Sequence, residues 1–473
     1  MKTTRFSSFT TLAALGAFAS LAVLSPREAS AAGTALDVQS GRGTGMAAAT
    51  TAMIDDSSSI FYNPAGIAQG KKLDVQAGIH LIQPGFSYTS PAGEKTSLPF
   101  SVVTPFHVYA SGGITDDLSI GIGVFTPFGL TLKWPDAWAG RHMITEASLQ
   151  TFYVNPTVAY KLGPVRIGAG FQLVRANVEL KRDIRLGNEI ANADIGGATW
   201  GVGGNVGVQV EAIKQYLQFG AHYRSAVSLD FEGDGHFSGV PRALAGSLHD
   251  QIVKTSVTQP DSLAMGVATH PIPKLVLDFD AVWIGWGKFH SIDLNFPNDA
   301  SGSLSSSQRK DWNNTVNFHL GAEGELSDNW MLRGGVLVDP SPSPDKTLTP
   351  DIPDAMRVNL AVGATWKHES GFRVDGGYQF LFLTGKTSTA PQFPGEYGGY
   401  VNILGLSVGY STPQEKVASN DAPPPPPPPP SGGDVTPPPP PPPSPEPAPS
   451  AAPPVEPAPA PAPAPAPEAT PTP

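Results

Sequence analysis

The sequence predicts an all-β protein, namely a transmembrane antiparallel β-barrel of about fourteen strands with a small N-terminal helical hatch inside its lumen. Three observations support this fold class. A secretory leader opens the chain, no window of eighteen apolar residues follows residue 70, and segments between residues 71 and 410 alternate apolar residues with polar residues or glycine. A large secreted β protein is the rival interpretation.

The first 31 residues have the pattern of a signal peptide. Lys2 and Arg5 precede an apolar run from Leu12 to Leu24, and Ala29-Ser30-Ala31 provides a small-x-small cleavage signal near Ala31. The run is too short for a spanning helix, although a membrane anchor is the alternative. The chain has no cysteine, which excludes a lipoprotein anchor and disulfides.

Residues 32–70 are predicted to form the hatch. The glycines of Gly41–Gly45 favour turns or close backbone approach over a regular helix, whereas Met46–Met53 is a brief helix former. Asp55-Asp56 and the following serines can cap a second short helix, and Asn63-Pro64 favours a turn or a new helix start. The segment is too short to build its own core, so we expect it to pack against the barrel rather than to form a disordered arm.

Residues 71–410 are predicted to form the barrel wall. Alternation with a period of two places one set of side chains on each face of a strand. In a membrane barrel the apolar set faces lipid, whereas in a soluble sandwich it would face inward. The clearest alternating segments are Leu118–Val124, Val165–Leu173, Leu217–Arg224, Met356–Lys367 and Leu404–Tyr410.

Short polar turns alternate with long irregular connections along the wall. The predicted short turns are 114–117, 162–164, 271–273, 327–329 and 368–371. The predicted long loops are 131–147, 183–196, 232–250, 295–313, 340–355 and 386–398. Outer-membrane barrels have short periplasmic turns and long outer loops, so this pattern favours the Gram-negative outer membrane, with both termini in the periplasm.

Two local breaks interrupt the alternation. Pro127, Phe128 and Gly129 fall at the end of the third strand, where they predict either a strand end or a kink that leaves a gap in the wall. In Leu173-Val174-Arg175 the apolar phase slips by one residue, which predicts a bulge or the exit from the membrane zone.

Residues 411–473 are predicted to be a disordered periplasmic tail. They are rich in proline and alanine and form a polyproline II spacer rather than a core. At ~3.1 Å per residue the tail could extend on the order of 150–190 Å, which is long enough to enter the peptidoglycan layer. The tail leaves Tyr410 to act as the terminal aromatic residue of the barrel.

Short motifs, each weak alone, occur in an informative order over residues 33–410. They are Asn63-Pro64-Ala65, Thr126–Leu130, Trp138–Arg141, Val154–Lys161, Tyr223–Ser225, Trp283–Phe289, Leu332–Val336, Asp339–Pro342 and Ile352–Asp354 followed by Arg357. Together they make the chain resemble the FadL, OmpP1 and TodX family of outer-membrane transporters for long-chain fatty acids and hydrocarbons.

The resemblance implies a mechanism and candidate sites. The barrel would be blocked by a hatch whose motif is Asn63, Pro64 and Ala65. Ligand would be collected at the outer loops, held in an apolar pocket, and released sideways through a gap at the kink, Pro127–Gly129. The polar groups that face the fatty-acid carboxylate would be Arg175 and Asp339, for which a solvated lumen or loop charge is the alternative.

The chemistry of such a cargo fits a dry pocket. Burial of an acyl chain gains about 0.8 kcal/mol per methylene, and a guanidinium pairs well with a carboxylate. The alternatives are a general diffusion porin, which needs no hatch, and a structural barrel that tethers the envelope through its tail. Outer-membrane lipid and lipopolysaccharide, and through the tail peptidoglycan, are further expected partners of a monomeric barrel.

The sequence predicts no cofactor, metal ligand or catalytic residue. The histidines are scattered without metal spacing, and Gly201–Gly204 lacks the lysine and helix of a phosphate loop. No local signature of an outer-membrane lipase is present. The net charge of -11 argues against nucleic acid as a partner.

Overall fold

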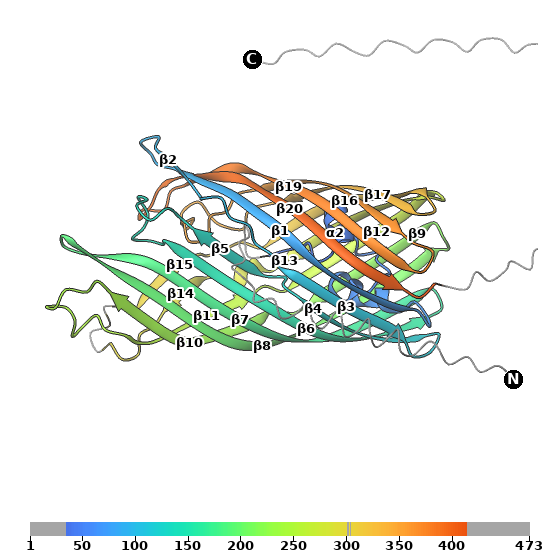
Figure 1. Cartoon of the computed structure of the whole chain (residues 1–473), viewed down its shortest axis with the longest axis horizontal. Helices are drawn as coiled ribbons and strands as arrows, with labels where there is room; N and C mark the ends of the chain where they lie inside the picture. The colour runs from blue at the N-terminus through green and yellow to red at the C-terminus, as the bar shows by residue number, and fades with distance from the viewer. Residues whose placement is uncertain (1–34, 300–301, 303, 414–473) are drawn as a thin grey trace, which may run out of the picture. The chain divides into compact units, whose positions relative to one another are not determined.

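A computed structural model describes residues 35–299, 302 and 304–413 of the chain. The predicted signal peptide, residues 1–31, lies outside the described residues, as does the tail beyond residue 413. The described chain forms a closed antiparallel barrel of fourteen wall strands, as predicted (Figure 1). Within these residues, no helix has both the length and the apolar character needed to cross a membrane.

The wall is built from continuous and interrupted strands. The continuous strands are β1 (Leu73–Thr89), β6 (Glu146–Leu162), β7 (Val165–Leu186), β8 (Glu189–Ile213), β13 (Leu275–Ile284), β16 (Thr315–Ser327), β17 (Trp330–Asp339), β18 (Arg357–Lys367), β19 (Phe372–Ser388) and β20 (Gly395–Ser411). The interrupted ones are β2 (Lys95–Ser97) with β3 (Phe106–Gly113), β4 (Leu118–Phe125) with β5 (Gly129–Lys133), β9 (Leu217–Arg224) with β10 (Val227–Ser238), and β11 (Gln251–Gln259) with β12 (Ser262–Ile272).

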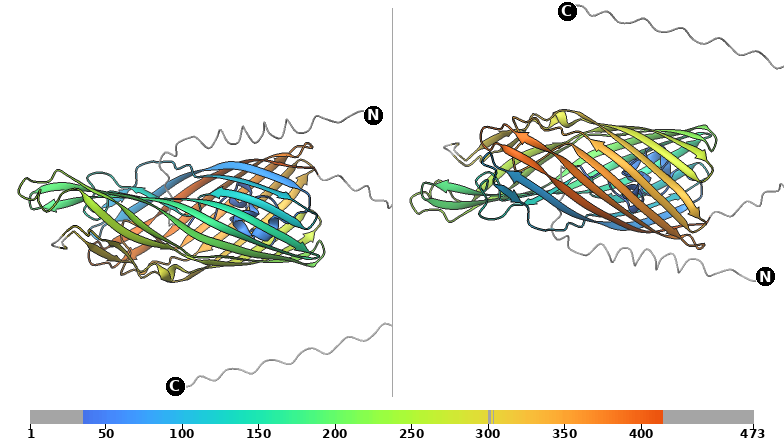
Figure 2. Two further views of the ribbon diagram at one scale, coloured as in Figure 1. Left: turned by 90° about the horizontal axis from the view of Figure 1, so that it is seen from below. Right: turned by 90° about the horizontal axis from the view of Figure 1, so that it is seen from above.

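The barrel closes between its first and last strands. β1 pairs with β20 from Asp74 opposite Ser411 to Thr89 opposite Glu396. Both ends of the wall therefore lie at the end of the barrel that carries the short turns. At the opposite end β7, β8 and β10 reach beyond the other strands (Figure 2). A small sheet of β14 (Ser291–Leu294) and β15 (Ser306–Arg309) and the turn η2 (Trp286–Lys288) belong to the connections there.

The outer surface of the wall carries the apolar face of the predicted alternation. Ile120, Phe171, Leu360 and Val362 are 50 to 61% exposed, whereas inward neighbours such as Ser119 and Gln172 are fully buried. A soluble sandwich would bury the apolar set instead. The exposed apolar band is what a lipid-facing wall requires, so this part of the prediction is confirmed.

The predicted loop 183–196 is wrong, and the loops 232–250 and 386–398 are shorter than predicted, because only residues 239–250 and 389–394 of them lie outside strands. Residues 183–196 were expected to be irregular, but β7 and β8 continue through them to a tight turn at Gly187-Asn188. Gly187 has a φ of 68°, a conformation that glycine adopts without steric cost. The charged residues that suggested a loop lie in a hairpin beyond the apolar band, where neither face needs to be apolar.

The hatch has a different local structure from the one predicted. The helix α2 forms at Gly41–Gly45, where glycines were expected to prevent it, and Ser40 caps it by accepting a hydrogen bond from the Gly43 amide. The segment 46–53 forms turns instead of the predicted helix, with left-handed backbone at Ala47 and Ala48. Two further turns, α3 (Ser59–Tyr62) and η1 (Pro64–Ile67), follow. Packing inside the barrel overrides helix propensity here.

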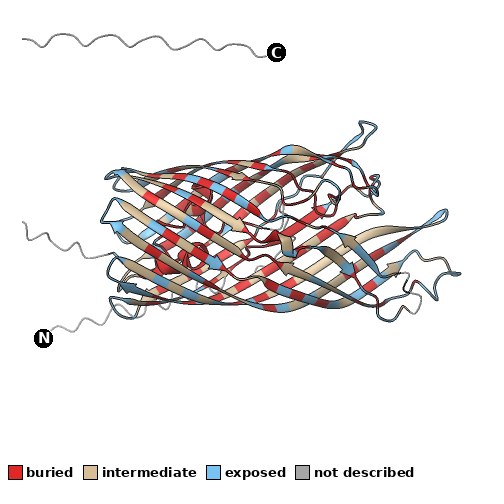
Figure 3. Ribbon diagram, turned by 180° about the vertical axis from the view of Figure 1, so that it is seen from behind, coloured by how far each residue is buried: buried red, intermediate tan, exposed pale blue. Residues whose placement is uncertain are grey.

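The hatch lies inside the barrel, in the half near the short turns (Figures 2 and 3). Nearly all of its residues from Val38 to Ala68 are buried, although the segment has almost no core of its own. Its apolar side chains Ile60, Phe61 and Tyr62 join the same buried cluster as wall residues such as Tyr109 and Phe125.

Candidate functional site

The wall meets the hatch through a ring of inward-facing glycines. At each of them an added Cβ atom would lie 2.1 to 3.0 Å from a hatch atom, closer than such atoms normally approach. The glycines are Gly121, Gly168, Gly207, Gly220, Gly266, Gly321, Gly335, Gly363, Gly377 and Gly405, each on a different wall segment. Glycine weakens a strand but permits close backbone approach. At these positions the wall is therefore less stable as a strand but lets the hatch pack closely against it.

The predicted hatch motif lies against two of these glycines. Asn63 Oδ1 accepts a hydrogen bond from the Ala65 amide and so begins η1, with Pro64 at its first position. The Asn63 amide nitrogen donates to Val208 O on β8 at 3.0 Å and to Thr51 O within the hatch at 2.8 Å. Added Cβ atoms at Gly168 and Gly207 would meet Pro64 and Asn63 at 2.4 and 2.1 Å. Asn63 therefore shapes the hatch through its side-chain carbonyl group and joins the hatch to the wall through its side-chain amino group.

Buried charges fix the other side of the hatch. Arg42 pairs with the buried Asp56 and the exposed Asp55 of the hatch and with the buried Glu323 of β16, at 2.7 to 3.0 Å. Glu323 in turn pairs with Arg333 of β17 at 2.5 Å. The Asp280 carboxylate of β13 accepts hydrogen bonds from the amides of Thr50 and Thr51. Removing one partner of a buried pair is costly, so these contacts hold the hatch body in place.

The predicted kink interrupts the third wall strand. Residues 126–128 separate β4 from β5, and Phe125 pairs with Tyr153 while Gly129 pairs with Gln150. β4 pairs with β3 on its other side, but the ladders of the described residues pair β5 with β6 alone and β2 with β1 alone. The wall therefore lacks a ladder between β2 and β5, beside Pro127 and Phe128.

The N-terminal segment, Ala35–Ser40, occupies this break from the inside. Ala35 forms a bridge with Phe128, and the Leu36 amide donates to Pro127 O at 2.8 Å. Gln39 adds two hydrogen bonds to the backbone of Thr126, one from each end of its side-chain amide. Gln39 thereby forms hydrogen bonds with the backbone N–H and C=O groups of Thr126, which the missing ladder would otherwise leave unpaired.

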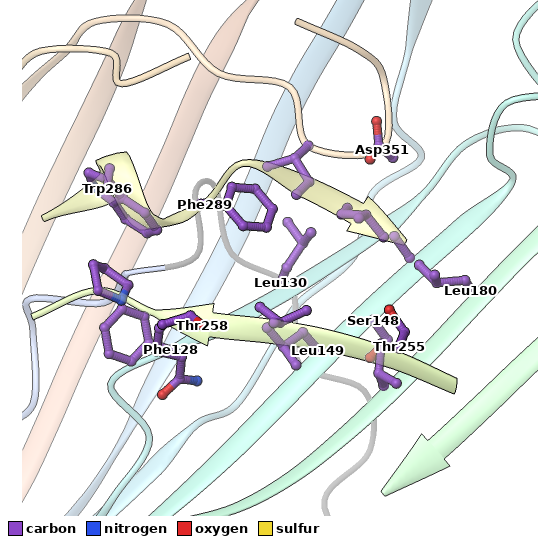
Figure 4. A pocket seen from close by; sticks show the side chains of 17 residues that line it. Phe128, Leu130, Ser148, Leu149, Leu180, Thr255, Thr258, Trp286, Phe289 and Asp351 are labelled. Atoms are coloured by element: carbon purple, nitrogen blue, oxygen red, sulfur yellow. The ribbon is translucent and has the colours of Figure 1, made fainter. Parts of the chain in front are cut away.

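An apolar cavity begins at the kink and extends toward the loops. It contains about 730 Å³ between its lining atoms, including solvent at its mouth. Figure 4 shows Trp286 and Phe289 on one side and Phe128 and Leu149 on the other. The remaining lining is mostly aliphatic, supplied by β5, β6, β7, β11 and the connections after β13 and β17: Leu130, Ala147, Val178, Leu180, Val257, Pro260, Ile292 and Ile352.

The phase slip in β7 reflects this cavity. β7 pairs with β6 and β8 without a register shift, so the predicted bulge is absent. Phe171 and Leu173 face outward, and Val174 and Ala176 are fully buried on the inward face. Because the lumen is apolar at this level, the inward face of the strand becomes apolar as well, which the sequence shows as a change of phase.

An ion pair lies at the loop end of the cavity. Asp351 lines the cavity and accepts hydrogen bonds from Lys310 Nζ at 2.7 and 2.9 Å, and the same nitrogen donates to Thr349. Both charged side chains are almost fully buried. Burial would raise the pKa of Asp351, but the charge and hydrogen bonds of Lys310 lower it overall, and burial lowers the pKa of Lys310.

The two predicted carboxylate-facing residues do not line this cavity. Asp339 is buried in a neighbouring cavity beside the N-terminal segment, where it pairs with Arg357 at 2.6 Å. Arg175 is on the outward face of β7, together with Phe171 and Leu173, and its guanidinium lies 5.2 Å from the ring centre of Trp200. Inward side chains of β7 have even numbers at this level, so Arg175 points away from the lumen.

Sequence reasoning missed Lys310 as a buried residue and did not assign cavity roles to Trp286, Phe289 or Ile352, although three of these lie within the motifs quoted for the family resemblance. The signal was present in Trp283–Phe289 and Ile352–Asp354, but only the fold brings the two connections together. No cluster of three or more metal-binding side chains occurs in the described residues.

A closed membrane barrel with a hatch in its lumen, a broken ladder and an apolar cavity has the architecture of an outer-membrane channel for hydrophobic molecules. The comparisons specify this class. A family model described as outer membrane protein transport protein (OMPP1/FadL/TodX) matches residues 22–411.

Named relatives and solved structures agree with it. The long-chain fatty acid transport protein of Escherichia coli K12 is 24% identical over 419 residues, covering 78% of this chain and 92% of that protein. The 47 kDa outer membrane protein of Pasteurella multocida is 26% identical over 420 residues, covering 81% and 94%. A Pseudomonas aeruginosa FadL homologue superposes with a TM-score of 0.73 at 16% identity, covering 80% and 99%. The Pseudomonas putida toluene transporter TodX gives 0.62 at 14% identity, covering 81% and 100%.

The chain therefore belongs to the FadL, OmpP1 and TodX family of outer-membrane transport proteins. The family resemblance and the outer-membrane localisation predicted from the sequence are confirmed, and the relatives are transport channels rather than enzymes. The two structural likenesses, at such low identity, support the fold alone.

Proposed function

We propose that the protein takes up long-chain fatty acids or other hydrophobic compounds across the outer membrane. Cargo binds in the apolar cavity, the N-terminal segment and hatch move, and the cargo leaves sideways through the wall beside the kinked third strand. The observation that carries this proposal is the cavity itself, which is lined by large apolar side chains and ends at Phe128, directly at the break in the wall.

The cavity suits an alkyl or aromatic cargo. Each buried methylene gains about 0.8 kcal/mol, so a chain of many carbons gains enough to offset the loss of its freedom on binding. The relatives named for fatty acid transport and the structures named for toluene transport support this choice of cargo. The seated hatch disfavours a general diffusion porin, because a porin needs an open aqueous lumen.

Lateral exit keeps the cargo out of water. Among the described residues, the N-terminal segment covers the break between β2 and β5 through few contacts. They are the bridge of Ala35 to Phe128, the hydrogen bond from the Leu36 amide to Pro127 O, and the two hydrogen bonds between Gln39 and Thr126. These contacts are far fewer than those of a wall ladder, so the N-terminal segment is the part of the hatch that can leave with least cost. In this arrangement the short-turn end faces the periplasm.

A reversible crosslink tests this route. Ala35→Cys combined with Phe128→Cys places two cysteines at bridged positions, where antiparallel neighbours are close enough for a disulfide, in a chain without other cysteines. We expect the oxidised protein to bind oleate but to lose most oleate uptake, and a reductant to restore uptake in the same cells.

The matched control is a pair of cysteines at Lys254 and Asn295, which form a bridge between β11 and the connection after β14, away from the N-terminal segment. Its oxidation should leave uptake unchanged, and the single Phe128→Cys variant accounts for the lost side chain. Normal uptake by the oxidised Ala35–Phe128 crosslink would refute the lateral route. Absence of saturable oleate or hydrocarbon binding by the wild-type protein would refute the function. The predicted contacts with lipopolysaccharide and peptidoglycan and the monomeric state stay predictions.

A further inference from the structure

A buried arginine lies between the hatch and the kinked strand without a carboxylate partner. Arg224, at the end of β9, is 6% exposed. Its Nη2 atom donates a hydrogen bond to Phe61 O at 2.7 Å, and its Nε atom has no hydrogen-bond partner in the described structure. No ion pair within 4.0 Å includes it among the described residues; Asp37 acts on it only from a greater distance. A buried cation normally has a charged partner.

Aromatic rings surround the guanidinium on the path from the hatch to the kink. Its carbon lies 4.3 Å from the ring centre of Phe61 and 5.9 Å from that of Phe125, the last residue before the break. Phe125 also stacks on Tyr109 and Tyr153, with ring centres 5.8 and 5.7 Å away. The aromatic rings carry no charge, so they compensate the positive charge of the guanidinium only in part. They do not occupy its N–H groups as a carboxylate would.

Other unsatisfied donors gather in the same cluster. The Tyr109 hydroxyl and the Gln259 side-chain nitrogen are buried without a partner, while the Gln259 oxygen accepts from Tyr153. Gln259 lines the apolar cavity, and Tyr153 packs against Phe128, which lines it too. Contacts between successive rings, Phe128 with Tyr153 and Tyr153 with Phe125, therefore connect the cavity lining to Arg224. Buried donors in such number around one cation are what an anionic guest requires.

We propose that Arg224 recognises the ionised carboxylate of a fatty acid as it leaves the cavity for the break in the wall. This inference rests on the proposed function and names the chemistry that the route selects. A carboxylate accepts from Nε, which has no partner, and from Nη2, where it replaces Phe61 O, so one of the hydrogen bonds that hold α3 to the wall is removed. A neutral hydrocarbon has no acceptor to offer, so it passes without using Arg224.

The test compares an acid with its uncharged analogue. Oleate and oleyl alcohol share the same chain length and double bond but differ in the head group. We expect Arg224→Gln to weaken oleate binding to the purified full-length protein at pH 8 about tenfold, as the loss of a charge-assisted hydrogen bond implies, and to change oleyl alcohol binding less than twofold. Arg224→Lys, which keeps the charge without the fork, should recover part of the loss.

Two controls separate recognition from structure. Arg175→Gln removes the same charge from the outward face of β7 and should bind both ligands as the wild type does. Ion conductance in planar bilayers reports whether the hatch of each variant is still seated. Equal losses for oleate and oleyl alcohol in Arg224→Gln would overturn the proposal in favour of a structural role, and unchanged oleate binding would overturn it outright. Failure of the wild type to bind either ligand would instead refute the proposed function.

Discussion

The two halves of the lumen use the same β-barrel alternation in opposite ways. Near the short turns the inward positions are glycines and buried charges, such as Gly168, Gly207 and Glu323, which fit the hatch. Toward the loops the inward positions are Leu130, Leu149 and Val178, which line a cavity. The first half is specific because it is filled by a fixed protein segment, whereas the second is permissive because apolar contact has no direction.

The difference fits the proposed function, in which one barrel blocks water and admits hydrophobic cargo. Steric fit and buried ion pairs hold the hatch in its half of the lumen, and their loss should open a path for ions. Loss of apolar contact in the cavity half should instead weaken ligand binding without opening such a path. Ion conductance and ligand affinity can therefore be changed separately.

The largest effect is expected from filling a glycine of the hatch seat. In Gly168→Val even the first added carbon would lie 2.4 Å from the backbone of Pro64, and backbone atoms cannot move aside cheaply. We expect the hatch to be displaced, with steady ion conductance in planar bilayers and loss of oleate uptake. Gly334→Ala is the matched control, because its nearest atom beyond its chain neighbours lies 3.8 Å from the added carbon. If bilayers containing Gly168→Val show no ion conductance, the fit of the hatch against the glycines is not what blocks ions.

The second effect concerns the buried charges. In Arg42→Met the ion pair between Glu323 and Arg333 of the wall remains. The ion pairs that Asp55 and Asp56 of the hatch form with Arg42 are lost. Breaking a buried pair costs roughly 3–5 kcal/mol, so the hatch should open intermittently rather than permanently. Single-channel recording should show brief openings, with a barrel that still migrates as folded protein on a gel. Conductance identical to that of the wild type would show that the glycine seat alone holds the hatch.

A smaller effect is expected in the cavity half. Phe289→Ala removes an aromatic wall of the cavity, and burial of some 50 Å² of apolar surface is worth about 1–1.5 kcal/mol, or roughly tenfold in affinity. Oleate and oleyl alcohol should lose affinity equally, since the ring contacts the chain and not the head group. Planar bilayers that contain this variant should show no ion conductance. A loss confined to oleate would instead place the head group beside Phe289.

The smallest expected effect is a flat pH response at the loop end of the cavity. Because the pKa of Asp351 lies below its ordinary value of 3.8, the pair with Lys310 forms fully above that pH and is lost only as the pH falls through the lowered value. Burial lowers the pKa of Lys310, so the pair is also lost as the pH rises through that lowered pKa. Oleyl alcohol binding should therefore be constant from pH 5 to pH 8. A change across this range would show that the pair titrates there.

The sequence was informative wherever the barrel wall repeats a local rule. Period-two alternation predicted the strands and their lipid-facing sides, and short polar turns predicted one end of the barrel. It failed at residues 183–196, because a hairpin beyond the membrane carries the same charged residues as a loop. It also failed in the hatch, where α2 forms on glycines because Gly43 packs on Tyr62 and Gly45 on Gly363.

The candidate sites divide in the same way. Asn63 and the Pro127–Gly129 break lie where the motif order placed them, at the hatch–wall contact and at the interrupted ladder. Arg175 faces away from the lumen, and Asp339 is engaged by Arg357 in another cavity. A local motif does not reveal whether a side chain faces the lumen or the outside of the barrel. This holds especially where the polarity of the lumen changes along the strand.

The sequence by itself determined the closed antiparallel wall, its lipid-facing surface and the separate N-terminal segment, because period, turn chemistry and segment length are local properties. Only the tertiary structure decided which inward positions receive the hatch and which surround the cavity, and that Lys310, Phe289 and Arg224 are buried there. Those assignments depend on contacts between residues far apart in the chain. These contacts form only when the barrel closes and brings the distant residues together.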